Sequence, residues 1–418
     1  MKTKSFVFCC LCIVLLICNA CEEPLSQNKY EDNTKLWPAF DSITSKVGYI
    51  NEKGEMVIPP QYKGAGFFSN GKALVYIEDY KTQFIDTKGN VVYTLPEAEG
   101  CDSYFYNGYM KFYKYYPASL GIAPKYGLYD SNFNVVLPDV FRELGTMSKE
   151  GLVATEAGYY NKKGELALTL DTDSFDINTA SAIVYKYGDF CDGVAVIQVT
   201  RFNKERLSYS YSVGAINTKG EWVIDTTLYR DLRSVGGGLL AYSDTTTTSN
   251  GLYPLFGLMD THGNKVTEPI FMDVKNFEDD NLLPASCGEY SQWGYVDKTG
   301  TIRIEPQFIY CEPFHEGVAW ACKSMIYDGD VVDNDYCLID TQGNVLVDFG
   351  KDVRPYTCYH NGLIGVVVVD RINKKKFYKY IDKNNNTVYS WEQDFDKTET
   401  LFSPYLMLPS RFPKNEQK

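Results

Sequence analysis

The chain has 418 residues, a formal net charge of −13 and a hydrophobic fraction of 44%. The negative charge argues against binding to nucleic acid or to anionic membrane surfaces, because both need basic patches. The composition is that of a globular protein, and its 34 tyrosines and 23 phenylalanines favour strands over helices.

The first residues form a predicted export signal. Lys2 and Lys4 precede an apolar run over residues 6–18, and the small residue Ala20 lies directly before Cys21. A basic start, a short apolar run and a small residue before the cut are typical of a signal peptide. The run is too short for a permanent membrane helix, which needs roughly 20 apolar residues. An ordinary signal peptide cleaved near Ala20 and a short membrane anchor are the alternatives.

The position of Cys21 resembles the lipobox of bacterial lipoproteins, since the thiol follows a small residue and polar sequence begins at once. The pattern departs from the family at Cys18, where Leu is usual. Glu22 and Glu23 look like the surface-export signal of some Bacteroidetes lipoproteins. The resemblance implies a lipid on Cys21 that contacts the membrane, and a place in the cell envelope, at the outer membrane.

The rest of the chain repeats one pattern, an apolar run followed by Asp or Asn, two polar residues and Gly. Nine such units about 40 residues long run from roughly Lys46 to Trp391. Their Asp and Asn positions, the marker residues, are Asn51, Asp86, Asp130, Asn161, Asn217, Asp260, Asp297, Asp340 and Asp382.

The spacing of this pattern predicts a bulged hairpin turn. Asp or Asn at the first position of a type I turn can accept hydrogen bonds from later backbone amides. Gly three residues on tolerates the positive φ that such a turn requires. Asn385 can replace that Gly, but Phe133 cannot do so cheaply. The third turn is therefore predicted to be built differently, with Asn134 in the left-handed conformation.

A β-rich run follows each turn, and several runs reach a proline, as at Pro59, Pro138 and Pro306. Proline cannot donate to a ladder, so these residues are predicted to close the strands. A second turn signal comes later in four units, as in Asn70-Gly71, and another strand starts there.

Residues 293–300, with 304–308 and 314–319, are similar to a WG repeat, and so are residues 47–62. The resemblance covers nearly the whole chain after the signal, although only the seventh unit keeps the Trp-Gly pair itself, at Trp293 and Gly294. It implies tandem β units in a bacterial protein, with no shared catalytic residues.

The predicted fold is therefore all-β, a tandem array of about nine β-hairpin or three-strand repeats. A lone hairpin is marginal in water, so each unit must cover its apolar face with the next. A superhelical stack and a closed propeller-like ring both satisfy this need, and the uneven units slightly favour the open stack. We divide the chain into a signal peptide (1–20), a lipidated cysteine and tether (21–45), the array (46–397) and a C-terminal cap or tail (398–418).

Five longer segments fall in one slot of the repeat and are expected to cluster on one rim: residues 113–124, 200–212, 243–254, 324–335 and 370–376. Variable loops of repeat proteins usually carry function, and exposed tyrosines supply flat contact area for proteins or sugars. The candidate ligand-binding residues are Tyr113, Tyr115, Tyr116, Arg201, Arg206, Tyr209 and Tyr211. The alternative is that these segments are tolerated surface loops or extended hairpins.

Catalytic residues, metal ligands and cofactors are not predicted. His262, His315 and His360 each occupy a repeat slot, and the acidic stretch 328–335 departs from the spacing of a calcium loop. Seven cysteines beyond Cys21 lack C-x-x-C spacing and are predicted to be mostly buried fillers, with one or two disulfides possible.

The sequence thus favours a non-enzymatic binding scaffold at the cell envelope for a protein or glycan partner. The alternatives are an envelope enzyme, such as a glycan hydrolase with its acid and base among the loops, and a structural spacer.

Overall fold

The computed structural model describes residues 34–77, 81–114, 116, 122–170, 182–203, 207–244, 248–249, 253–278, 281–287, 292–328 and 331–394. All regular elements in these ranges are strands, and no helix in them is long and apolar enough to span a bilayer. The expected signal peptide, Cys21 and residues 398–418 lie outside the described residues.

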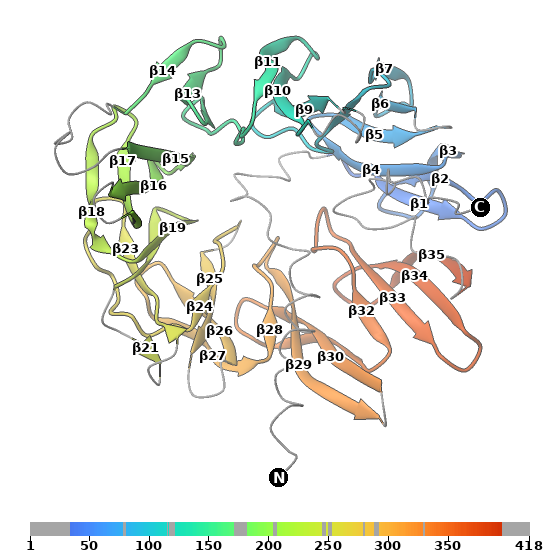
Figure 1. Cartoon of the computed structure of the whole chain (residues 1–418). Helices are drawn as coiled ribbons and strands as arrows, with labels where there is room; N and C mark the ends of the chain where they lie inside the picture. Colours follow the sequence, from blue (N-terminus) through green and yellow to red (C-terminus); the bar gives the residue numbers. More distant parts are fainter. Residues whose placement is uncertain are drawn as a thin grey trace, which may run out of the picture.

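The described strands form nine antiparallel blades arranged in a ring (Figure 1). Blade 1 contains β1 (Trp37–Asp41), β2 (Lys46–Ile50) and β3 (Met56–Tyr62). Blade 2 contains β4 (Gly64–Ser69), β5 (Lys72–Tyr76), β6 (Thr82–Asp86) and β7 (Val91–Thr94). Blade 3 contains β8 (Glu99–Cys101), β9 (Tyr109–Lys114), β10 (Lys125–Asp130) and β11 (Val135–Phe141). The array begins at Trp37, inside the residues that the sequence assigns to a tether.

Blades 4 to 6 follow in chain order. Blade 4 contains β12 (Leu152–Thr155), β13 (Gly158–Asn161) and β14 (Leu166–Leu168). Blade 5 contains β15 (Ala182–Cys191), β16 (Val194–Asn203), β17 (Ser208–Asn217) and β18 (Trp222–Tyr229). Blade 6 contains β19 (Asp231–Gly236), β20 (Leu239–Ser243) and β23 (Gly257–Asp260), next to a two-stranded sheet of β21 (Thr248–Ser249) and β22 (Tyr253–Pro254).

Blades 7 to 9 complete the ring. Blade 7 contains β24 (Asp273–Val274), β25 (Leu282–Cys287), β26 (Gln292–Asp297) and β27 (Ile302–Phe308). Blade 8 contains β28 (Tyr310–Cys311), β29 (Val318–Asp328), β30 (Val331–Asp340) and β31 (Val345–Gly350). Blade 9 contains β32 (Val353–Pro355), β33 (Ile364–Asp370), β34 (Lys375–Ile381) and β35 (Thr387–Asp394). In a four-stranded blade the first strand lies toward the centre of the ring and the fourth lies outside, as β15 and β18 show in Figure 1.

Each blade contains one marker residue, which ends or directly follows the strand before the outermost one. The nine predicted units therefore correspond to nine blades. The marker side chain accepts the predicted backbone hydrogen bonds. Asp86, for example, accepts from the amides of Lys88 (2.9 Å) and Asn90 (2.8 Å). The turns also contain a feature that the sequence pattern did not predict, a side-chain pair between the marker and the residue four positions later. The Asn90 amide donates to Asp86 (2.9 Å).

The marker pair keeps its hydrogen bond when the two chemical roles are exchanged. Asp86 accepts from Asn90, whereas Asn51 donates from Nδ2 to the carboxylate of Glu55 (2.8 Å). The Asp-Asn arrangement recurs at Asp130, Asp260, Asp340 and Asp382, and the Asn-Glu arrangement recurs at Asn161 and Asn217. Either arrangement leaves one carboxylate per turn.

The expectation for the third turn is wrong. Phe133 itself adopts the left-handed conformation, with φ 63°, and its amide donates to Asp130 O (3.0 Å) as the glycines of other turns do. The ring of Phe133 stacks on Tyr93 of blade 2 at a centroid distance of 4.2 Å and lies 4.9 Å from Phe84. Packing on the neighbouring blade offsets the backbone strain that the sequence analysis treats as prohibitive.

The prolines do not close the outer strands, contrary to the prediction. β3, β11 and β27 run through Pro59, Pro138 and Pro306 to an aromatic residue beyond them. Each of these strands bulges against its partner, as between the pairs Tyr49–Ile58 and Val47–Tyr62. A strand on the outer edge needs no second ladder, so a proline there costs little and blunts the edge.

The bulge explains why the strand next to the outermost one carries glycine. A Cβ on Gly294 would lie 2.3 Å from Ile304 O and 2.8 Å from Pro306 N. Gly48 is crowded in the same way, at 2.4 Å from Ile58 O. The Gly of the Trp-Gly pair is therefore required by the proline bulge of the adjacent outer strand.

Buried apolar residues join each blade to the next. One cluster packs Tyr159 of blade 4 against Phe190 and Ile197 of blade 5, and another packs Tyr295 of blade 7 against Phe314 of blade 8. Burial between neighbours is what the sequence analysis expects of units that cannot fold alone. Acidic side chains in the tight first turns add polar links, since Glu150 accepts from the amide of Gly193 (2.8 Å).

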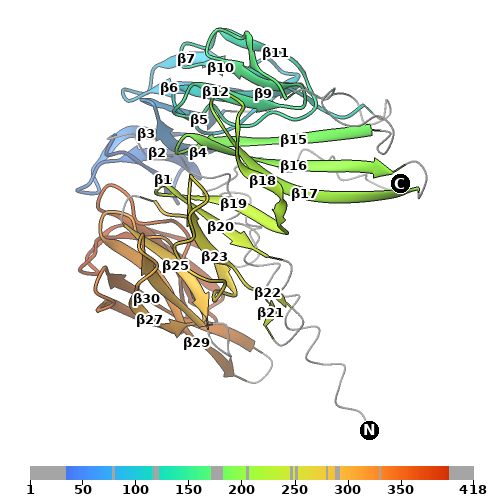
Figure 2. The same ribbon diagram turned by 90° about the vertical axis from the view of Figure 1, so that its left-hand side faces the viewer.

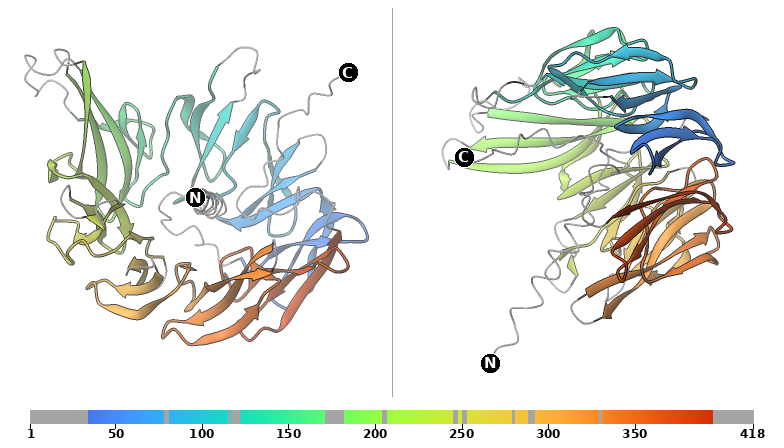
Figure 3. Two further views of the ribbon diagram at one scale, coloured as in Figure 1. Left: turned by 60° about the horizontal axis from the view of Figure 1, so that its bottom comes forward. Right: turned by 90° about the vertical axis from the view of Figure 1, so that its right-hand side faces the viewer.

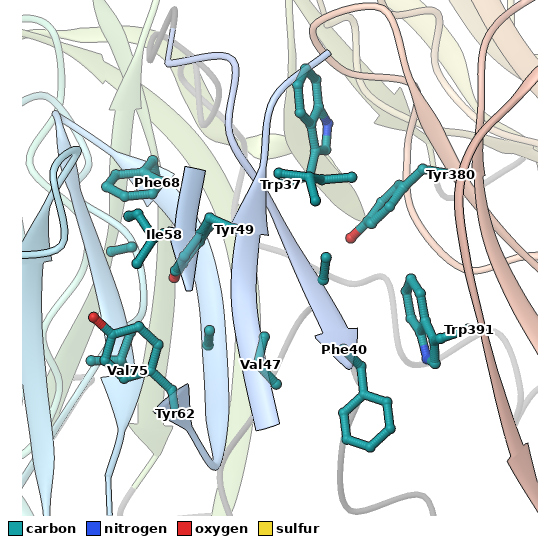
Figure 4. Packing of buried hydrophobic residues seen from close by; sticks show 14 of the residues in the cluster. Trp37, Phe40, Val47, Tyr49, Ile58, Tyr62, Phe68, Val75, Tyr380 and Trp391 are labelled. Atoms are coloured by element: carbon teal, nitrogen blue, oxygen red, sulfur yellow. The ribbon is translucent and has the colours of Figure 1, made fainter. Parts of the chain in front are cut away.

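The first and last blades close the ring in the same way. Tyr380 of β34 donates to Pro38 O of β1 (2.9 Å), and one buried cluster contains both Trp37 and Trp391 (Figure 4). Of the two geometries left open by the sequence, the closed ring is the observed one, and the slight preference for an open stack is wrong. The unequal unit lengths arise largely from hairpins of different length, which leave the packing between blades unchanged.

Candidate functional site

The five longer segments all connect the second and third strands of a blade, namely of blades 3, 5, 6, 8 and 9. Successive antiparallel strands alternate in direction, so these connections share one face of the ring, which we call the hairpin face. The shared slot is thus confirmed. At least two of the segments are extended hairpins, which the sequence left open beside surface loops, since Asn203 pairs with Ser208 and Asp328 pairs with Val331.

Blade 5 carries the most prominent hairpin. Its strands β15, β16 and β17 are ten residues long, and Figure 2 shows them reaching further to one side than the strands around them. The same projection is visible from another direction in Figure 3. The outer part of this sheet therefore stands clear of the ring.

The strand register sorts the projecting side chains into two faces. Val184, Thr200 and Tyr211 lie directly opposite one another across the three strands, and Phe202 pairs with Tyr209 two residues further out. Directly paired residues, and residues two apart on a strand, share one face of a sheet. We call the surface made by Val184, Thr200, Phe202, Tyr209 and Tyr211 the aromatic face.

The aromatic face is open to solvent. Tyr211 is 76% exposed, Tyr209 is 63% exposed and Val184 is 62% exposed. The rings of Phe202 and Tyr209 pack against each other at a centroid distance of 4.9 Å, which holds both in place. Tyrosine is enriched among the residues that contribute most to binding at interfaces, so this surface is a candidate contact site.

The base of the same face is fixed and polar. Lys186, Gln198 and Val213 form the next row toward the ring. Lys186 and Gln198 are exposed, whereas Val213 is buried in the core shared with blade 6. The aromatic face is therefore anchored at one end by the blade 5–blade 6 core and flanked there by an ammonium and an amide group.

The opposite face of the projection is used differently. Tyr185 and Val199 pack into the core between blades 4 and 5. Arg201 lies on this face, where it donates to the hydroxyls of Ser212 and Thr226. Arg201 is thus held within its own sheet and does not share a surface with Tyr209 and Tyr211.

The structure does not gather the remaining candidates around these tyrosines. Tyr113 lies in β9 of blade 3, half-buried against Tyr126 at a centroid distance of 5.8 Å, and Tyr116 follows that strand. Tyr115 and Arg206 lie outside the described residues. Blade 4 separates the blade 3 candidates from those of blade 5. Tyr209 and Tyr211 are therefore the candidates that share one exposed surface.

Sequence reasoning missed Val184, Gln198 and Thr200 on this surface. The signal was the alternation at Tyr209 and Tyr211, two residues apart, which indicates one face of a strand. Because residues 200–212 were not predicted to be strand, that alternation was not used. The partners on β15 and β16 depend on the strand register, which the sequence of one strand does not reveal.

Asp189 and two histidines outside the aromatic face make contacts within the fold. The described residues contain no group of three or more His, Cys, Asp or Glu side chains placed to hold a metal ion. Burial raises the pKa of Asp189, although the amide and hydroxyl of Thr146 donate to it at 2.9 and 2.7 Å. His315 is buried in a first turn, and His262 donates its backbone amide to the marker Asp260.

The seven cysteines of the described chain are thiols, with five buried and with Cys287 and Cys358 partly exposed. The prediction of buried filler residues is thus confirmed for most of them. Burial raises the pKa of Cys311 and of Cys337 to about 12.

Three segments of the chain match the family described as "WG containing repeat", over residues 48–80, 256–289 and 293–324. Each match runs from the strand that precedes the marker turn of one blade to the second strand of the next, as from β2 to β5. The repeat unit in the sequence therefore spans the junction between two blades. No curated protein matches the chain.

Solved structures are similar at low identity. Acylaminoacyl peptidase from Pyrococcus horikoshii aligns with a TM-score of 0.31 and 11% identity, over 49% of this chain and 38% of its own. BamB from Moraxella catarrhalis has a TM-score of 0.31 and 10% identity, over 79% and 87% of the two chains. The β-propeller domain of the Trilobed protease from Pyrococcus furiosus has a TM-score of 0.34 and 9% identity, over 82% and 98%. These likenesses leave ligand and activity open.

Proposed function

We propose that this chain is a lipid-anchored, non-enzymatic β-propeller of the cell envelope that holds a protein or glycan partner on the hairpin face. The observation that carries the proposal is the aromatic face of blade 5, which exposes Tyr209 and Tyr211 on a sheet whose base is fixed in the ring. Aromatic side chains give large contact area at low entropic cost, because they have few rotatable bonds.

The ring suits a scaffold because neighbouring blades share cores that anchor the base of the projection. A surface that is already ordered loses less conformational entropy when a partner binds. The envelope location rests on the basic start, the apolar run and the small residue before Cys21. Lipid attachment is tested by incorporation of labelled fatty acid into the full chain, which Cys21→Ala should abolish.

Partner binding is tested by recovery from envelope extract with residues 22–418 as bait. The decisive variant replaces residues 200–211 by Asn-Gly, so that Val199 and Ser212, which pair in the native sheet, flank a tight turn. The matched control shortens the blade 8 hairpin between Ser324 and Asp335, which also pair and lie on the same face.

We expect the partner to be lost with the blade 5 hairpin and retained with the blade 8 hairpin removed. Equal recovery by both variants would contradict the proposed role of the aromatic face. Conversion of a recovered glycan to a smaller product would contradict the non-enzymatic part of the proposal and favour an envelope hydrolase.

A further inference from the structure

We infer that the aromatic face of blade 5 binds a neutral polysaccharide chain, an inference that rests on the proposed binding function and names its ligand. The size, chemistry and charge of the face together favour a neutral sugar chain over a protein partner or an anionic polymer.

The aromatic face is small. Neighbouring strands lie about 4.8 Å apart and rise about 3.3 Å per residue, so its two rows of side chains on three strands have a footprint of roughly 100–200 Å² in the plane of the sheet. A stable protein interface buries about 800 Å² on each partner. A protein partner would therefore need contacts beyond the aromatic face, whereas a few sugar rings of a chain that lies across it match its footprint.

The chemistry of the face combines apolar rings with hydrogen-bonding groups. A pyranose presents C–H groups on its ring faces and hydroxyls around its edge, so it is recognised by a flat ring beneath it and polar groups beside it. Tyr211 supplies an exposed ring, and Tyr209 supplies a second ring two residues along the same strand. Thr200 lies between Val184 and Tyr211, and Gln198 is exposed in the next row.

The order of these groups gives the ligand a direction. From the tip of the sheet toward the ring, the rows pass from Phe202 and Tyr209, through Thr200 and Tyr211, to Lys186 and Gln198. Stacking groups thus lie at the tip and hydrogen-bonding groups lie at the base. A sugar chain that follows the rows can stack one unit and hydrogen-bond the next.

The net charge of the chain disfavours acidic polysaccharides as the preferred ligand. The chain has a net charge of −13, and Lys186 is the single cation among the described residues of the aromatic face and of the row at its base. An anionic polymer would approach a protein of its own sign, which lowers its association rate and affinity. A neutral polymer has no such penalty.

The test is affinity gel electrophoresis of residues 22–418 in gels that contain one polysaccharide each. The neutral probes are hydroxyethyl cellulose, galactomannan, laminarin and dextran, and the anionic probe is polygalacturonate. We expect at least one neutral probe to retard the protein and polygalacturonate to leave its mobility unchanged.

Substitutions then locate the site. Tyr211→Ala should weaken binding about tenfold, as expected for the loss of one stacked ring. Tyr211→Trp should retain binding and add a fluorescence change on titration. Trp222→Ala is the matched control, because Trp222 is an exposed aromatic residue of the same blade that begins β18 beside the marker turn. Equal thermal melts of the variants would show that each folds.

Absence of retardation by all four neutral probes, retardation by the anionic probe alone, or binding unchanged by Tyr211→Ala would each overturn the inference. If a protein partner depends on the blade 5 hairpin while all neutral probes fail, the glycan inference falls and the proposed scaffold stands. If partner recovery does not depend on that hairpin, the proposed function itself falls.

Discussion

Tyr380 donates a hydrogen bond to Pro38 O at 2.9 Å and so joins the last blade to the first, across 342 positions of sequence. Tyr49, Tyr159 and Tyr295 occupy the same slot, two residues before the marker. Each donates to a backbone oxygen of the following blade at 2.7 Å, as Tyr159 does to Gly188 O. The junction between the chain ends is therefore a copy of the internal junctions.

This likeness predicts that Tyr380→Phe and Tyr159→Phe destabilise the protein by similar amounts. Each removes a buried hydroxyl and leaves a carbonyl without its donor, which costs about 1–3 kcal/mol. Urea unfolding monitored by fluorescence measures both. A loss with Tyr159→Phe and none with Tyr380→Phe would show that the ring does not depend on this contact for closure.

Closure lies beyond what one unit of sequence can reveal. The repeat at Asn51 or Asp340 predicts a turn, a strand and a neighbour, because those depend on contacts within about 40 residues. Whether blade 9 meets blade 1 depends on the sum of nine angles between blades, which the marker spacing does not contain. Trp37 and Trp391 are large apolar residues of the kind found in cores, but nothing in the sequence near either one indicates that they share a cluster.

The candidate site was predictable to a similar depth. The slot common to the insertions follows from repeat position, and Tyr209 and Tyr211 were identified as binding candidates. Arg201 faces the other way because side chains alternate along β16, and the sequence did not predict that residues 200–212 continue the strands. Val184 joins the same face only through the register of β15 on β16, which is a tertiary fact.

The exchanged roles in the marker turns give a second prediction. Asp86→Asn should destabilise the turn by about 0.5–1.5 kcal/mol, because Asn90 then loses its charged acceptor. Adding Asn90→Glu recreates the Asn51–Glu55 arrangement and should restore the stability. Chemical denaturation of the two single variants and the double variant completes a double-mutant cycle. Additive losses would contradict the pairing.

A third prediction concerns acid. Burial opposes ionisation of Asp297, but the Thr299 hydroxyl, the Arg303 guanidinium and the backbone amides of the turn outweigh it and lower its pKa to about 2. A carboxyl whose folded pKa is depressed contributes stability above its unfolded pKa of 3.8 and loses it as the pH falls toward 2. Asp297→Asn should therefore flatten the dependence of unfolding free energy on pH between about 5 and 2. An unchanged pH profile would contradict this.

The thiols supply a fourth prediction. Cys311 and Cys337 are fully buried, and burial raises the pKa of each to about 12, so little thiolate exists at neutral pH. Cys287 and Cys358 are partly exposed. Brief alkylation of the native protein followed by mass spectrometry should label Cys287 and Cys358 first, and Cys311 and Cys337 only after unfolding. Early labelling of Cys337 would show that blade 8 opens locally.

Phe133 provides the last prediction, because it sits where other turns carry Gly. Its φ of 63° costs about 1–2 kcal/mol for a non-glycine residue. Phe133→Gly removes that strain but also removes the ring stacked on Tyr93. Loss of a large packed ring costs about 3–5 kcal/mol when fully buried, and less at a half-buried position such as this one. A net loss of about 1–3 kcal/mol is therefore expected in urea unfolding.

Asn385→Gly is the matched control, since Asn385 has a φ of 66° in the same slot. It should leave stability unchanged or slightly raised. Stabilisation by Phe133→Gly would mean that strain outweighs packing at this turn, and that the contact with blade 2 does not hold the two blades together.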